Sequence, residues 1–289
     1  MTALQGYTGN ATSDIAPNHK MGLQLESPLL AASGCWGFAN EYSDLVETRL
    51  LGALITNPIK WNPSKNVSGQ YAQAVPGGIA LQDGLPNPGL HGAIRRFGNK
   101  WRHMDCPIIV HITVNDKYQA RKCVDLLEEL ENVIAIELSF RHDEDPRAAA
   151  ATVATAAQGL LPVVVQTPFS RTLEFTALAE DAGAQAVTVS SPPRATLKSG
   201  NSWFDGSLYG SGWFTHALHN VYKLRQETTL PIIATGDIHS VTQIKAMLSV
   251  GAQAVQLQSL VWIDPQKVNT MLRLWKACSD RRKSYSAYN

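Results

Sequence analysis

Eight short apolar segments recur along the chain, and longer segments with helical patterning separate them. Several are near-continuous runs of Val, Ile and Ala, which is typical of strands buried on both faces of a parallel sheet. They are Leu29–Ser33, Gly52–Asn57, Pro107–Thr113, Val133–Ser139, Leu161–Thr167, Ala186–Ser190, Pro231–Gly236 and Ala252–Gln258. Eight strand–helix units form either a closed barrel or an open doubly wound sheet. Because the chain lacks a glycine-rich dinucleotide-binding motif, the sequence predicts an α/β fold, the (β/α)8 TIM barrel.

Two long insertions interrupt this alternation, residues 61–84 after the second strand and residues 192–213 after the sixth. Each leaves the C-terminal end of a strand, which is the functional face of a barrel. We therefore expect both insertions on that face, either packed over the barrel mouth or serving as a substrate lid. For the domain organisation we expect a polar N-terminal arm over residues 1–20 and a single barrel domain over residues 21–289.

The composition excludes several classes of partner. Lys and Arg number 25 against 24 Asp and Glu, so no strong net field would recruit nucleic acid or an anionic membrane. No apolar run is long enough to span a bilayer, and no signal-peptide pattern opens the sequence. The four cysteines show no paired spacing, which favours reduced thiols. We expect a cytoplasmic protein with a small-molecule ligand and without nucleic-acid or membrane partners.

A set of motifs in a fixed order resembles the dihydroorotate dehydrogenase family, over about residue 21 to Pro265. The motifs are Ser27-Pro-Leu-Leu-Ala-Ala-Ser-Gly-Cys-Trp, Gly84-Leu-Pro-Asn-Pro-Gly89, Ala135-Ile-Glu-Leu-Ser139, Ile232-Ile-Ala-Thr-Gly-Asp-Ile238 and Gly251-Ala-Gln-Ala-Val-Gln-Leu-Gln-Ser259. The resemblance implies a (β/α)8 barrel that binds flavin mononucleotide (FMN) and oxidises a carbon–carbon single bond of a dihydropyrimidine. It also suggests a homodimer, the assembly that family members often form.

The cofactor contacts that this resemblance implies have changed in charge. They fall on Ala32, Ser33, Gln166, Gly236, Asp237, Gln258 and Ser259. Asn57 and Gln166 stand where the family has lysines, so two cations that support the flavin are missing. Asp237 puts a carboxylate at the phosphate end, where two charges ~4 Å apart repel by roughly 4 kcal/mol in a medium of intermediate dielectric constant. We therefore expect no cofactor, with FMN as the alternative.

The substrate positions have changed as well. By the same resemblance they fall on Asn57, Asn87, Ser139 and Ser190. Asn87 keeps the family's residue, whereas Ser139 and Ser190 replace asparagines that hold the pyrimidine. Glu144 replaces another and would repel a substrate carboxylate. The sequence therefore argues against dihydroorotate itself as the substrate.

Three residues form the candidate catalytic group. His142 aligns with the family's general base in the loop after the fourth strand, and imidazole can move protons near neutral pH. His111 and Glu137 lie on neighbouring strands, where either could orient the ring of His142. The spacing of these residues is not a known metal-ligand motif, so we expect no metal.

Three functional interpretations remain open at this point. The chain is a non-redox enzyme that uses His142 at the inherited mouth, an FMN-dependent oxidoreductase of the CH–CH class with a remodelled site, or a non-catalytic paralogue that serves as a binding or assembly subunit. The interpretation favoured by the altered cofactor positions is acid–base chemistry on a small molecule without FMN.

Overall fold

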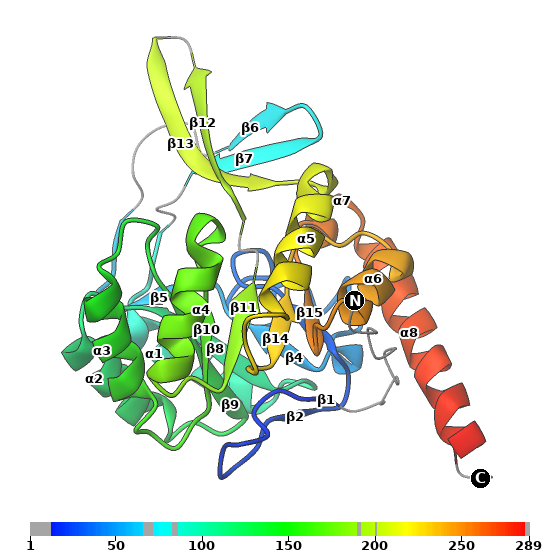
Figure 1. Cartoon of the computed structure of the whole chain (residues 1–289), viewed down its shortest axis with the longest axis horizontal. Coiled ribbons are helices and arrows are strands. Elements are labelled where there is room, and N and C mark those ends of the chain that lie inside the picture. The colour runs from blue at the N-terminus through cyan, green and yellow to red at the C-terminus, as the bar shows by residue number, and fades with distance from the viewer. Residues whose placement is uncertain (1–12, 66–71, 83–85, 190–191, 200, 287–289) are drawn as a thin grey trace.

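The computed structural model describes residues 13–65, 72–82, 86–189, 192–199 and 201–286. Eight parallel strands form a closed ring, which confirms the predicted barrel (Figure 1). In ring order they are β3 (Leu29–Ala31), β4 (Ala53–Ile55), β8 (Ile108–Thr113), β9 (Val133–Ser139), β10 (Val163–Gln166), β11 (Ala186–Val189), β14 (Ile232–Ala234) and β15 (Ala254–Leu257). The ring closes because β15 pairs with β3 and β4 pairs with β8.

Helices cover the outside of the ring and follow the strands in turn. They are η1 (Thr48–Leu50), α1 (Leu90–Arg102), α2 (Lys117–Leu127), α3 (Pro146–Ala156), η2 (Phe169–Arg171), α4 (Thr172–Asp181), η3 (Ser211–Trp213), α5 (Phe214–Leu224), α6 (Val241–Ser249), α7 (Leu260–Ile263) and α8 (Pro265–Ser286). Local side chains fix where several of them begin: Asp145 accepts from the main-chain N–H of Ala148, and Pro146 occupies the first turn of α3. This is the arrangement expected of an N-cap followed by proline.

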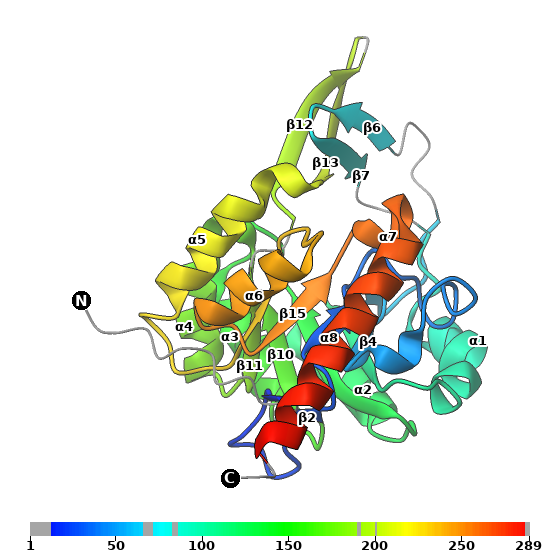
Figure 2. The same ribbon diagram turned by 90° about the vertical axis from the view of Figure 1, so that its right-hand side faces the viewer.

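The interior of the barrel has an apolar lower layer. All eight strands contribute to it: Leu30, Ala53, Ile55, Ile109, Ala135, Val164, Ala186, Ile233 and Ala254. Beneath them lies a hairpin of β1 (Ser13–Asp14) and β2 (Gln24–Leu25), which plugs the N-terminal end of the barrel with Ile15, Leu23 and Leu25 (Figures 1 and 2). Because strand side chains alternate, the residue two positions further along each strand faces the interior again. This second layer is polar on most strands, and it leads to the C-terminal mouth.

The predicted domain division stays a prediction. Residues 1–12 lie outside the described residues. The structure places residues 13–20 in the plugging hairpin, with Ile15 fully buried against the barrel interior.

The two insertions combine into one antiparallel sheet above the C-terminal mouth. The sheet runs β12 (Arg194–Ser199), β13 (Ser202–Tyr209), β7 (Gly78–Gln82) and β6 (Ala72–Val75). It stands on the opposite side of the barrel from the β1–β2 hairpin in both views (Figures 1 and 2). The placement of both insertions on the C-terminal face is therefore confirmed. A further short strand, β5 (Ile59–Lys60), extends the barrel edge beside β8.

The insertion sheet joins the barrel at Gly210, directly after β13. Gly210 has φ +141°, and a Cβ there would lie 2.2 Å from the carbonyl oxygen of Gly77. Only glycine permits this close approach of two main chains.

No helix within the described residues is both long enough and apolar enough to cross a membrane.

The plugging hairpin generates a stability prediction. Ile15 is fully buried, so Ile15→Ala should lower the free energy of unfolding by about 2–5 kcal/mol through lost burial and the cavity left behind. Met21, in the same hairpin, is 65% exposed, and Met21→Ala should change stability by less than about 0.5 kcal/mol. Urea denaturation measures both variants. Equal effects of the two substitutions would contradict the assignment of this hairpin to the core.

Candidate active site

The polar layer of the barrel centres on the carboxylate of Glu137. His111 Nδ1 lies 2.7 Å from Glu137 Oε2. Thr188 Oγ1 donates to Oε1 at 2.6 Å, and Gln256 Nε2 donates to the same oxygen at 3.0 Å. All four side chains are essentially inaccessible to solvent. They come from β8, β9, β11 and β15, so one carboxylate joins four strands across the barrel.

The network continues upward from His111 to the barrel mouth. His111 Nε2 lies 2.7 Å from the hydroxyl oxygen of Ser139, the last residue of β9. Ser139 is half-buried, and Thr113 Oγ1 lies 3.3 Å from its hydroxyl oxygen. The main-chain N–H of His111 donates to Thr56 Oγ1 at 3.0 Å, which fixes the backbone beneath the ring. Ser139 therefore links the buried carboxylate to the surface where a ligand would enter.

A second buried carboxylate, that of Asp237, lies after β14. Its Oδ1 accepts from the main-chain N–H of Ser259 at 2.9 Å and from the Ser259 hydroxyl at 2.5 Å. Its Oδ2 accepts from the N–H of Gly210. The N–H of Asp237 itself donates to Gln258 Oε1 at 3.0 Å. The Asp237 side chain thus occupies donors that could otherwise serve a bound anion.

Asp237 also has an unusual backbone conformation. Its φ of +53° lies in the left-handed region, and it follows Gly236 at φ +143°. A non-glycine residue in this region costs roughly 1–2 kcal/mol. The hydrogen bonds made by the carboxylate offset that strain, so the side chain and the turn stabilise one another.

Aromatic residues pack beside the Asp237 end of the mouth. The Tyr209 and Trp262 rings lie 5.2 Å apart, and Trp262 Nε1 donates to the carbonyl oxygen of Cys35 at 2.7 Å. Burial raises the pKa of the Cys35 thiol well above its usual value, and the negative charge of Asp237 raises it further. Burial does the same to the pKa of the Tyr209 phenol. Both groups stay protonated, so Cys35 is not a reactive thiolate.

Buried polar atoms without a hydrogen-bond partner also lie around the mouth. Asn57 Oδ1 at the end of β4, Trp213 Nε1 before α5 and His239 Nε2 after β14 are buried without a hydrogen-bond partner. Each follows the C-terminal end of a strand. His239 Nε2 lies 3.5 Å from Asp237 Oδ1, within ion-pair range when the imidazole is protonated. A buried polar atom without a partner costs about 1–3 kcal/mol, so Asn57 Oδ1 and Trp213 Nε1 are available to a ligand in the mouth.

Several predicted site residues contribute to the frame of the mouth. Ser33 Oγ donates to the carbonyl oxygen of Thr56 at 2.7 Å, and the Ala32 N–H donates to the Leu257 carbonyl oxygen at 3.0 Å. The polar atoms of the Asn87 side chain make their hydrogen bonds within its own loop. The side chain donates to the Pro58 carbonyl oxygen at 2.7 Å and accepts from the N–H groups of Lys60 and Gly89, both at 3.1 Å.

The remaining predicted residues are spread more widely. Gln166 is half-buried at the end of β10, in register with Ser139. His142 is exposed in the loop after β9, where Arg171 donates to its carbonyl oxygen at 3.1 Å. Ser190 lies outside the described residues. The structure therefore brings His111, Glu137 and Ser139 into contact, whereas His142 makes no side-chain contact with them.

Sequence reasoning missed Thr188, Gln256 and Thr113. All three lie in strands that the sequence predicted correctly, and Thr188 and Gln256 bond to the same carboxylate. Counting every second residue from the apolar lower layer would have identified Thr188 and Gln256 as inward-facing.

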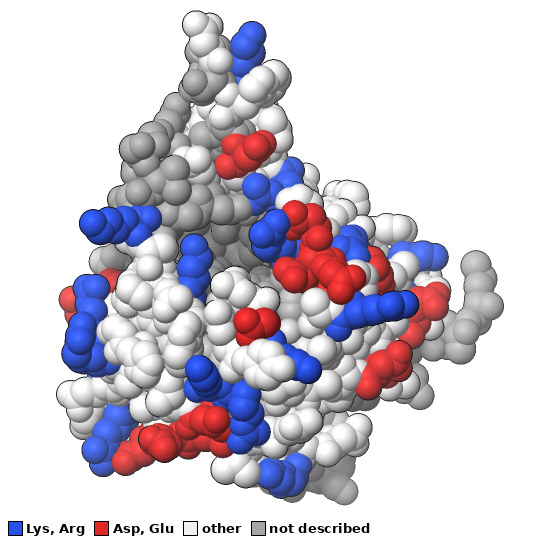
Figure 3. Space-filling model, turned by 90° about the vertical axis from the view of Figure 1, so that its left-hand side faces the viewer, with Lys and Arg blue, Asp and Glu red and all other residues white. Residues whose placement is uncertain are grey.

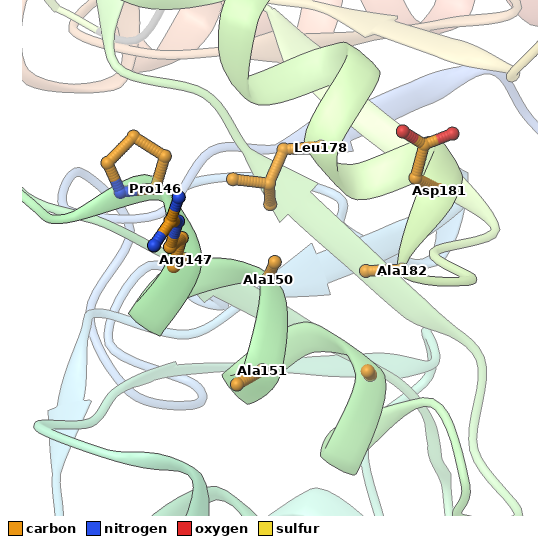
Figure 4. Close-up of a pocket in the computed structure, with 8 residues that line it drawn as sticks. Pro146, Arg147, Ala150, Ala151, Leu178, Asp181 and Ala182 are labelled. Atoms are coloured by element: carbon orange, nitrogen blue, oxygen red, sulfur yellow. The ribbon is translucent and has the colours of Figure 1, made fainter.

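The surface charge in Figure 3 and the hollow in Figure 4 point to no other site among the described residues. On the face shown in Figure 3, acidic and basic side chains are interspersed. A hollow of about 490 Å³ lies between α3 and α4, on the outer ring (Figure 4), and is lined mainly by alanines together with Leu178, Arg147 and Asp181. Among the described residues, no cluster of three or more His, Cys, Asp or Glu could hold a metal ion.

Comparison with known proteins gives one consistent family. A family model described as dihydroorotate dehydrogenase matches residues 17–273. The chain is 27% identical to the catalytic subunit of dihydroorotate dehydrogenase B (NAD(+)) from Bacillus pumilus (strain SAFR-032), over 84% of this chain and 85% of that protein. It is 24% identical to the protein of the same name from Geotalea uraniireducens (strain Rf4), over 86% and 88% of the two chains.

These matches correct the cofactor expectation. The family consists of FMN-dependent dehydrogenases, and the match spans nearly the whole barrel. The expectation of no cofactor is therefore wrong. It gave the lost lysines at Asn57 and Gln166 more weight than the resemblance of the whole chain.

The Asp237 carboxylate generates a binding prediction. Asp237→Gly should free the N–H groups of Ser259 and Gly210 and remove the nearby negative charge, so FMN should bind at least tenfold more tightly, which corresponds to ~1.4 kcal/mol. Asp237→Asn removes the charge but still fills the donors, so its affinity should lie between those of the Gly variant and the unaltered protein. Quenching of flavin fluorescence during titration measures all three.

The control for that titration is Asp205→Asn on the insertion sheet, where the carboxylate accepts from Thr196. It removes one charge at a distance from the mouth and should leave the FMN affinity unchanged. Weaker binding by Asp237→Gly, in a variant whose melting temperature is retained, would refute the competition between this carboxylate and the phosphate.

Proposed function

The chain belongs to the dihydroorotate dehydrogenase family, and from that membership we propose that it is an FMN-dependent oxidoreductase of the CH–CH class with a remodelled site. The observation that supports this proposal most strongly is the polar inner layer at the barrel mouth, where Asn57 Oδ1 is buried without a hydrogen-bond partner. By family membership, the flavin and its substrate would bind at this mouth. FMN, when bound, would supply the acceptor for the electrons removed from the substrate.

The residues at the ring end fit a flavin. Ser33 and Gln166 would lie beside the ring, and Asn57 offers a free amide oxygen. Because amides replace the family's lysines, the site would stabilise negative charge on the reduced ring less than a lysine-bearing site does. The cofactor should therefore be harder to reduce here, which suits a substrate that gives up its electrons readily.

The residues at the phosphate end fit the cofactor only after a local rearrangement. Gly236, Ser259 and Gln258 would surround the phosphate, but the Asp237 carboxylate holds the N–H of Ser259. The carboxylate must turn away before a phosphate can accept those hydrogen bonds. Asp237 would thus lower FMN affinity without excluding FMN.

The protein groups that would handle the substrate cluster at the end of β9. Ser139 faces the mouth and connects to His111 and Glu137 below it. His142, in the loop that follows, is the proton acceptor proposed from the sequence. Asn57 would hold a polar group of the substrate or of the flavin, and Asn87 would act indirectly by shaping its loop.

Assembly and location are also proposals. The relatives' printed names describe a catalytic subunit, and we propose that this chain likewise passes electrons to a partner subunit. A homodimer and a cytoplasmic location are consistent with the balanced charge of the chain.

The test of the proposed function is anaerobic reduction of the FMN-loaded protein by dihydroorotate. We expect dihydroorotate to bleach the visible absorbance of the oxidised flavin, with the colour returning when air is admitted, but more slowly than in a relative that keeps the asparagines replaced here by Ser139 and Ser190. A protein that binds FMN but is bleached only by dithionite has a different substrate. A protein that binds no FMN at high concentration of the cofactor would refute the proposal.

A further inference from the structure

We propose that Ser139 is the proton-accepting residue of this site, activated by His111. This inference rests on the proposed function and adds the residue that starts the reaction. The observation behind it is a carboxylate–imidazole–hydroxyl series. Glu137 Oε2 lies 2.7 Å from His111 Nδ1, and His111 Nε2 lies 2.7 Å from Ser139 Oγ.

The hydrogen bonds around Glu137 determine which nitrogen of His111 carries the proton. Thr188 and Gln256 both donate to Oε1, so Oε2 is the oxygen left for His111. An ionised carboxylate only accepts hydrogen bonds, so with Glu137 ionised the proton is assigned to Nδ1. The lone pair of Nε2 then faces the Ser139 hydroxyl. This is the arrangement by which a buried carboxylate and an imidazole activate a serine in unrelated enzymes.

The exposure of the three side chains decides which of them can contact a substrate. The side chain of His111 is 2% exposed and that of Glu137 is fully buried, so neither can contact a substrate. Ser139 is half-buried and ends its strand at the mouth, next to Thr113 and in register with Gln166. Of the three groups, the hydroxyl alone can receive a proton from a ligand, while His111 and Glu137 are positioning residues.

The proton transfer is balanced as follows. The substrate C–H bond breaks, its proton binds to Ser139 Oγ, and the hydroxyl proton moves to His111 Nε2. The electron pair stays on the substrate carbon and delocalises into the adjacent carbonyl as an enolate. Glu137 stabilises the imidazolium that forms. In heavy water the reverse transfer returns a deuteron to the same carbon, so the step is visible without any oxidation.

A thiol in place of the hydroxyl provides a test that needs neither flavin nor substrate. In Ser139→Cys, His111 should promote thiolate formation, so iodoacetamide should alkylate this position at least tenfold faster than in the double variant S139C/H111Q. S139C/E137Q should also lose reactivity, because the imidazolium loses its counter-charge. Peptide mass spectrometry resolves each site.

The chain supplies the controls for that measurement. Burial raises the pKa of the Cys106 and Cys123 thiols to about 12, and that of the buried Cys35 is raised as well, so these three should react slowly. The half-exposed Cys278 serves as the internal standard. Thr113→Cys places a thiol at the neighbouring strand end without imidazole contact and should react no faster than Cys278. Equal alkylation of S139C and S139C/H111Q, with melting temperatures retained, would overturn the proposal.

Deuterium exchange separates Ser139 from His142. The unaltered protein, with dihydroorotate in heavy water, should exchange the C–H beside the carbonyl, as followed by proton NMR. Ser139→Ala should slow this exchange by about 10²–10⁴-fold, the usual loss for a general base, whereas His142→Ala should keep it. The opposite pattern would assign the role to His142 and refute that of Ser139. The alkylation assay needs neither flavin nor substrate, so a failure of the relay and a failure of the proposed function give different results.

Discussion

The carboxylate of Glu137 is the interaction on which the rest of this barrel depends. A buried charge is costly unless it is paired and hydrogen-bonded, and here His111, Thr188 and Gln256 supply three bonds from three other strands. The apolar lower layer closes beneath this network, and the N-terminal hairpin closes beneath that layer. The network therefore links four strands and leads to the hydroxyl of Ser139 at the mouth.

The second buried carboxylate, Asp237, follows the same physical rule with a different consequence. Its partners are main-chain N–H groups and one hydroxyl, which come from the two loops that meet at the rim of the barrel. The same donors would serve a phosphate, so the protein carries an internal anion where its family binds an external one. On the proposed function, the cost of releasing Asp237 would lower the FMN affinity. Loss of the lysines at Asn57 and Gln166 affects instead the charge that the flavin ring can hold.

The sequence predicted the fold well because each strand is a local, near-continuous apolar run, and Val133–Ser139 was placed without error at either end. It also placed both insertions on the correct face. It did not predict that they form one sheet, because that pairing joins residues more than 100 positions apart and leaves no pattern in the local sequence. The site was predicted only in part. Alignment pointed to the exposed His142, whereas the contact between His111 and Ser139 depends on strand register. Charge at Asp237 suggested loss of the cofactor because the sequence does not show that the carboxylate has other partners.

The central claim is that this mouth binds FMN, and a crystal structure of the protein grown with FMN tests it most directly. The account predicts the flavin ring over Asn57 and Gln166, the phosphate on the N–H of Ser259, and the Asp237 side chain turned away from that N–H. A flavin bound elsewhere on the molecule, or an unchanged Asp237–Ser259 contact with no flavin in the mouth at saturating concentration, would contradict it.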